Sequence, residues 1–194
     1  MRLGTNQPTV KPATPFESAH ALLVQLDQTP HLERWALPFP LAVYGTLRQS
    51  FRNHHLMQRA SITYHCRAFL PHFFARDIEL FFRQESTCPF EIFVYEPGAW
   101  RAVMPPIEEL EEFIPGRIVE GGYHRTLAWL HLLPDGYQHP AFTSDLPAER
   151  DLQIEPAQWQ QYDRVPCWIY SSLPQNRRVA EAAGSPIIWD GATR

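Results

Sequence analysis

The residues best suited to chemistry form a short loop punctuated by glycine, Tyr44-Gly45-Thr46-Leu47. It ends the apolar run over 41–44 and opens a polar, helix-compatible stretch over 49–60. A glycine that follows a strand can turn backbone N–H groups toward one point, which creates a small concavity for an anion. An ordinary corner between a strand and a helix has the same pattern. The loop is therefore a candidate binding element whose role depends on what faces it.

Glu120 is the carboxylate whose setting best suits acid–base chemistry. It precedes Gly121-Gly122 and the apolar stretch over 123–133. A carboxylate among apolar groups has a raised pKa, which suits a general base near neutral pH. A plain loop position accounts for Glu120 as well, and both interpretations stay open. Four further glutamates occupy a short amphipathic helix expected over 107–113, and most of them are expected to face water: Glu108, Glu109, Glu111 and Glu112.

Other catalytic chemistries find little support in the sequence. The nine histidines do not form a His-x-x-x-His pair with a carboxylate, and the three cysteines have no Cys-x-x-Cys spacing. The Gly-x-Ser-x-Gly pattern of hydrolases is absent, and Lys11 is the one lysine available as an amine nucleophile. We therefore expect no bound metal and no cofactor.

The elements that would position these residues are short and interleaved. A helix is expected over about 15–27, because Thr14 can cap it and Pro15 suits its first turn. Arg48 and Arg52 begin a basic face if the following stretch is an α-helix. Strands are expected over 41–44, 60–70, 77–82, 90–95, 123–133, 137–143 and 165–171, with a last helix over 175–183. This order predicts an α+β fold with a mixed, curled sheet or partial barrel and short flanking helices.

Composition narrows the class of protein. The chain has 194 residues and a net charge of −4, which gives no sign of a nucleic-acid partner. Its 19 prolines against 9 glycines predict short elements joined by stiff corners. Neither a signal peptide nor an apolar run of 18 residues is present, so we expect a cytoplasmic protein without membrane insertion.

Several of these segments resemble the γ-glutamylcyclotransferase-like (AIG2-like) family. Val43-Tyr44-Gly45-Thr46-Leu47, followed by Asn53-His54, is similar to the family's opening signature, and Tyr123-His124-Arg125 resembles its later Tyr-x-Arg strand. Cys167-Trp168-Ile169-Tyr170 resembles its closing strand. The resemblance implies a γ-glutamylcyclotransferase-like domain over 41–194 with an insertion over about 137–165. An N-terminal arm over 1–40 would precede it.

The resemblance also implies a reaction. In the family, a glutamate at a Glu-Gly pair after a helix accepts a proton from the α-ammonium of a γ-glutamyl substrate, and the freed amine attacks the γ-carbonyl to release 5-oxoproline. Tyr44, Gly45, Thr46 and Leu47 would then cradle the small γ-glutamyl substrate, while Tyr123 and Arg125 would shape its pocket. No cofactor is needed.

The sequence leaves open which residue would take the place of that glutamate as the base. Ile114-Pro115-Gly116 stands where Glu-Gly is expected, and the base would come from Glu120 a few residues later. Glu112 and Asp135 are the other candidate carboxylates. If none of them serves, the chain would be a non-catalytic member of the fold that binds a protein partner or regulates one.

Overall fold

The computed structural model describes residues 16–96, 98–114, 122–145 and 148–183 of the chain. Five strands carry the fold: β1 (Leu41–Val43), β2 (Ile62–Arg76), β3 (Glu79–Tyr95), β4 (Tyr123–Leu132) and β5 (Arg164–Ser172). Three α-helices accompany them: α1 (Glu17–Gln28), α2 (Trp100–Leu110) and α3 (Leu173–Ala183). Four 3₁₀ helices complete the described elements: η1 (His31–Ala36), η2 (His54–Arg59), η3 (Pro140–Phe142) and η4 (Pro156–Gln161). The predicted α+β class is confirmed.

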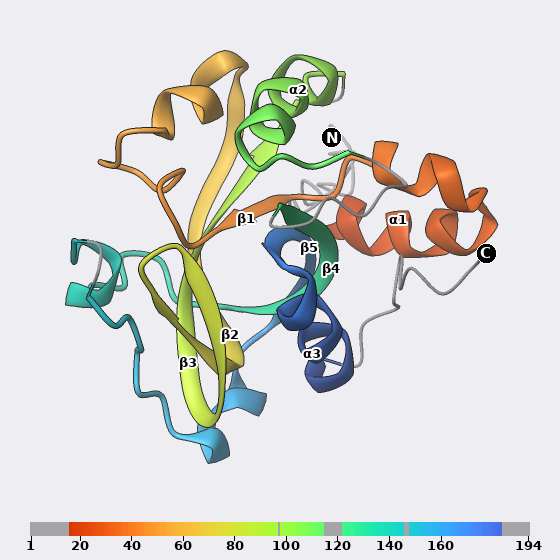
Figure 1. Ribbon diagram of the computed structural model, residues 1–194. Coiled ribbons are helices and arrows are strands. Elements are labelled where there is room, and N and C mark those ends of the chain that lie inside the picture. Colours follow the sequence, from red (N-terminus) through yellow and green to blue (C-terminus); the bar gives the residue numbers. More distant parts are fainter. Residues whose placement is uncertain (1–15, 97, 115–121, 146–147, 184–194) are drawn as a thin grey trace, which may run out of the picture.

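The strands close into a barrel in the order β1-β3-β2-β4-β5 (Figure 1). All neighbouring pairs are antiparallel except β1 and β5, which meet in parallel where Leu41 faces Trp168. The Trp168 N–H donates to the carbonyl of Pro40 at 2.8 Å, which secures this closure. Closure removes the free sheet edges that an open five-stranded sheet would expose.

Side-chain alternation along the strands divides the core into two clusters. On β1, Leu41 and Val43 join one cluster, whereas Ala42 and the following Tyr44 join the other. β5 alternates in the same way, with Trp168 in the first cluster and Cys167 in the second. This period of two is expected of strands buried on both faces. The first cluster also contains the apolar face of α2, and the second contains Val179 of α3.

Several strand predictions need correction. The segments over 77–82 and 90–95 contribute to one strand, β3, in which Thr87 and Cys88 still pair with β2 while residues 83–86 lie at the register shift. β2 continues past Pro71, where the register shifts and His72 adopts a φ of 67°. Proline cannot donate a ladder hydrogen bond, and a bulge is the usual way for a strand to accommodate it. The strand over 137–143 was wrong: this segment contains a turn and η3, because Pro140 suits the first position of a helical turn.

The basic face after Gly45 was also a wrong prediction. Residues 46–53 form turns, and helical structure begins only at His54 as η2. Arg48 is fully buried instead of solvated, and burial together with Arg150 lowers its pKa from 12.5 to about 10. Its guanidinium stabilises the fold by donating to backbone carbonyls of η3.

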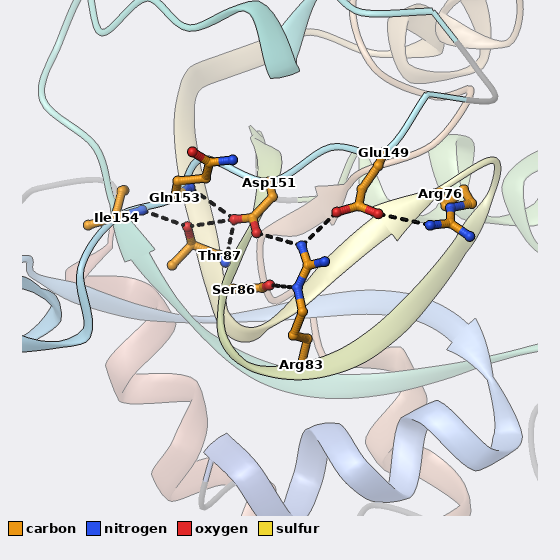
Figure 2. Close-up of polar contacts among 8 residues, drawn as sticks. All are labelled: Arg76, Arg83, Ser86, Thr87, Glu149, Asp151, Gln153 and Ile154. Atoms are coloured by element: carbon orange, nitrogen blue, oxygen red, sulfur yellow. Dashed lines mark hydrogen bonds and ion pairs between the residues drawn. The ribbon is translucent and has the colours of Figure 1, made fainter.

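The segment that the sequence marks as an insertion packs onto the hairpin of β2 and β3. Its Phe142, Leu152 and Trp159 are buried in a third cluster with Phe69 of β2. Beside this cluster, polar contacts join the segment to the same hairpin (Figure 2). Asp151 is central, because one carboxylate oxygen accepts from the Thr87 N–H at 2.9 Å and the other from Arg83 at 2.8 Å. The segment therefore braces the hairpin.

The N-terminal helix packs on the barrel. The helix expected over about 15–27 is α1, and its Ala19 and Leu26 are buried in the second and first clusters. Thr14 and Pro15, the residues predicted to begin it, lie outside the described part of the chain. In the described ranges, no helix combines the length and the apolar character needed to span a bilayer.

Candidate functional site

A cavity of about 220 Å³ opens beside the end of β1 and includes all four residues of the 44–47 loop in its lining. The remaining walls come from elements far apart in the sequence: Asn53 before η2, Ile78 at the tip of the β2–β3 hairpin, the end of α2, and Tyr123 and Tyr170 at the ends of β4 and β5. The predicted loop thus lies in a real cavity of the folded chain.

The loop is held in one shape by hydrogen bonds to the residues that follow it. The Asn53 N–H donates to the Thr46 carbonyl at 3.2 Å, and the Asn53 amide donates to the Thr46 hydroxyl at 2.9 Å. The Arg48 N–H donates to the Gly45 carbonyl at 3.3 Å. These contacts close the turn without using the N–H groups of Gly45 and Thr46. A loop fixed in this way offers its donors to a ligand at little entropic cost.

Two buried charges fasten the same loop to the rest of the molecule. The Arg48 guanidinium donates to the carbonyls of Ala141 and Phe142 at 3.1 and 2.8 Å, which ties the loop to η3. The Glu91 carboxylate of β3, which is almost fully buried, accepts from the Gln49 N–H at 2.7 Å. Charge-assisted bonds of this kind are stronger than neutral ones. No pattern in the sequence indicates this role of either residue, because their partners are backbone groups distant along the chain.

Glu111 is the one carboxylate among the described residues that line the cavity. It directly follows α2, and its carbonyl accepts from the Tyr123 N–H at 3.0 Å, which joins the helix end to β4. The side chain is partly buried, and burial raises the pKa of Glu111 from 4.5 to about 7. A carboxylate with this pKa can both accept and return a proton near neutral pH.

Three tyrosines surround this carboxylate. Burial raises the pKa of Tyr44, Tyr123 and Tyr170, and the charge of Glu111 raises each of them further. The Tyr123 hydroxyl lies 3.0 Å from both the Ile78 carbonyl and the Glu79 carboxylate. Within the described part of the chain, the buried hydroxyl of Tyr44 has no hydrogen-bond partner, and that of Tyr170 faces the Arg125 guanidinium, which can only donate, so both O–H groups lack an acceptor. Buried polar groups are normally paired, so these phenols are available to a bound molecule.

Arg125 lies behind the cavity wall, not among its lining residues. Its guanidinium is buried among the rings of Trp35, Trp100, Phe113 and Trp168, at 5.0–5.7 Å from their centres. It pairs with Glu108 at 3.1 Å and opposes the rise in the pKa of Tyr170. Arg125 therefore supports Tyr170 and the end of α2 and does not itself face the space.

The other carboxylates proposed from the sequence have different places. Glu120 lies outside the described residues. Glu112 is exposed and absent from the lining, and Asp135 lines a separate cavity next to Cys66. Sequence reasoning missed Glu111 because it extended the helix to Phe113, whereas α2 ends at Leu110. A signal was present in the apolar spacing of Ile107 and Leu110, because Glu111 directly follows the second of them.

No group of three or more histidine, cysteine, aspartate or glutamate side chains is placed to hold a metal ion within the described ranges. Comparisons of the chain with protein-family models, with curated proteins and with solved structures find no match. What the cavity can do therefore follows from its residues: a carboxylate of raised pKa, a loop with unused N–H groups, and buried phenols.

Proposed function

We propose that this protein is a γ-glutamylcyclotransferase-type enzyme, built on a γ-glutamylcyclotransferase-like barrel, and that Glu111 is its general base. The observation that carries the proposal is the meeting of Glu111 and the 44–47 loop in one cavity. The resemblance described above supplies the reaction, in which a base and such a loop act on a γ-glutamyl group. The chain would thereby use Glu111 where the sequence had suggested Glu120.

The backbone around Glu111 supports this assignment. Glu112 has a φ of 53°, in the left-handed region that glycine adopts most easily. The family has a glycine directly after its catalytic glutamate. Glu111-Glu112 therefore has the backbone geometry that a Glu-Gly pair would favour, with a strained glutamate in place of the glycine. Such strain is often found next to functional residues.

The proposed reaction needs no cofactor. The Glu111 carboxylate takes a proton from the α-ammonium of the substrate, and the freed nitrogen attacks the γ-carbonyl carbon. The attacking nitrogen loses a second proton as the ring forms, the bond from that carbon to the leaving nitrogen breaks, and the proton held by Glu111 passes to the leaving nitrogen. The products are 5-oxoproline and an amine, which carries the second proton away as an ammonium ion. Because the nucleophile belongs to the substrate itself, positioning and one base suffice for a large acceleration.

The rest of the cavity has matching roles. The unused N–H groups of the 44–47 loop and the hydroxyls of Tyr44 and Tyr170 are donors near Glu111, and such donors stabilise the oxygen that becomes negative during attack. A non-catalytic, partner-binding role was the other interpretation of the sequence. A carboxylate held at a pKa of about 7 favours catalysis, because perturbed pKa values concentrate at catalytic sites.

The test is the release of 5-oxoproline from γ-glutamyl amides by the wild type and by Glu111→Gln. We expect Glu111→Gln to lower the rate about 10²–10⁴-fold, the usual contribution of a general base. Glu112→Gln is the matched control, because its side chain is exposed and outside the cavity lining. An active Glu111→Gln together with an inactive Glu120→Gln would return the role to Glu120 and contradict the assignment.

A further inference from the structure

The cavity that we assign to γ-glutamyl transfer also indicates what the leaving group is. This inference rests on the proposed function and deepens it. We infer that the enzyme selects γ-glutamyl amides whose leaving amine carries an apolar, uncharged substituent, such as an aromatic or branched alkyl group, over those whose leaving amine carries a carboxylate. Ile78 and Leu110 are the residues assigned to this selection.

The first support is the number of charges at the cavity. Among its described lining residues, Glu111 and Arg52 are the charged ones. The γ-glutamyl head also carries two charges, an α-ammonium and an α-carboxylate. Glu111 must meet the ammonium to remove its proton, and Arg52 is the cation that remains for the carboxylate. A second carboxylate on the leaving amine would have no described cation in the lining to pair with, so its charge would add nothing to binding.

The second support is the apolar character of the exposed lining. Ile78 and Leu110 are 45% and 40% exposed, yet both line the cavity. They come from different elements, Ile78 from the tip of the β2–β3 hairpin and Leu110 from the last residue of α2. Exposed side chains that also line a cavity form its rim. The part of the substrate that extends outward from the γ-carbonyl would therefore lie against these two side chains and remove their apolar surface from water.

The third support is that the hairpin tip is held in place. The carbonyl of Ile78 accepts from the Tyr123 hydroxyl at 3.0 Å, and the carbonyl of Asp77 accepts from the buried Arg150 guanidinium at 2.8 Å. The hairpin is braced further along its length by the Asp151 contacts of Figure 2. Ile78 is thus a fixed part of the rim, and a fixed apolar contact can discriminate between substituents.

The experiment compares two substrates, γ-L-glutamylbenzylamide and γ-L-glutamylglycine. Both release a primary aliphatic amine, so their chemical reactivity is matched and the difference reports the leaving-group site. We expect kcat/KM for the benzylamide to exceed that for the glycine compound by about tenfold or more, the usual effect of an apolar contact of this size. Ile78→Ser and Leu110→Ser should each lower the benzylamide value several-fold more than they lower the glycine value.

Val24→Ser is the matched control, because Val24 is 63% exposed on α1 and outside the cavity lining, and it should change neither value. Thermal unfolding of each variant verifies that it is folded. Equal kcat/KM for the two substrates, or rim variants that lower both values alike, would overturn the selection and leave the proposed function standing. Release of 5-oxoproline from neither substrate would overturn the proposed function itself.

Discussion

Glu111 shows how one position can satisfy both the fold and the chemistry. Its backbone carbonyl joins the end of α2 to β4 through the Tyr123 N–H, while its side chain turns into the cavity. Burial without an opposing cation raises its pKa to about 7. A carboxylate left in this state is unfavourable for stability at neutral pH, and proteins keep such groups where function requires them.

Substitution of Gly45 should weaken substrate binding without lowering the free energy of unfolding. A Cβ added to Gly45 would meet no protein atom within 4 Å, and its φ lies outside the left-handed region. Nothing inside the protein therefore requires glycine, and the open space beside it belongs to the cavity. We expect Gly45→Ala to keep or raise the free energy of unfolding by about 0.4–1 kcal/mol. The same variant should raise KM for γ-glutamyl amides, because the methyl group takes space from the substrate.

Urea unfolding and steady-state kinetics on the same preparation check this prediction. Ala36→Gly is the control, since Ala36 is exposed and absent from the cavity lining, and this variant should leave KM unchanged. An unchanged KM in Gly45→Ala would show that the substrate does not approach Gly45.

The end of α2 is where the predicted and observed helix bounds differ. The sequence correctly predicted an amphipathic helix containing Ile107 and Leu110, but it placed the helix too late and ended it after Phe113. Pro105 and Pro106 obscured the beginning, because prolines usually mark helix starts and here lie inside the helix. The end was obscured because Glu112 adopts a backbone conformation that a non-glycine residue rarely shows. The true end exposes Glu111 to the cavity.

The β2–β3 hairpin is the element that the Asp151 network should stabilise. Backbone N–H groups of Thr87 and Gln153 and the Arg83 guanidinium lower the pKa of Asp151, although burial alone would raise it. We expect Asp151→Asn to reduce the free energy of unfolding at neutral pH by about 1.5–3 kcal/mol, as hydrogen bonds to a charged group typically contribute.

The lowered pKa of Asp151 determines in which direction its contribution to stability changes with pH. A lowered pKa in the folded state means that Asp151 contributes stability at neutral pH, and that this contribution disappears as the pH falls through the lowered value. Urea unfolding of the wild type and Asp151→Asn should therefore converge in acid. Asp145→Asn is the control, because Asp145 is exposed and its carboxylate has no hydrogen bond or ion pair within the described residues. A constant difference between wild type and Asp151→Asn at all pH values would contradict the role of the charge.

At the scale of the whole molecule, local patterns could predict elements but not how they meet. The strand that ends at Val43, the strand from Tyr123 and the strand that contains Trp168 follow from runs of apolar residues, and the α+β class follows from their order. Barrel closure depends on Leu41 meeting Trp168, a pairing between the first and last strands. Likewise, Glu111, Ile78 and the 44–47 loop share a cavity only through the tertiary fold.

The sequence also could not predict which charged side chains are buried. Arg48 is fully buried, although arginine is seldom buried without a carboxylate partner. In the fold it binds the carbonyls of Ala141 and Phe142, which lie more than 90 residues further along the chain. No spacing in the sequence reports such a contact, so the residues that fasten the loop could be found only in the structure.

The measurement that tests the central claim most directly is the pH dependence of kcat/KM for 5-oxoproline release from γ-L-glutamylbenzylamide. Because Glu111 must be ionised to accept the proton and burial holds its pKa at about 7, kcat/KM of the wild type should rise with pH and level off above this value. Glu111→Gln should have a low rate without this rise. A wild-type profile that is flat around pH 7, or a rise that persists in Glu111→Gln, would contradict the assignment of Glu111 as the base.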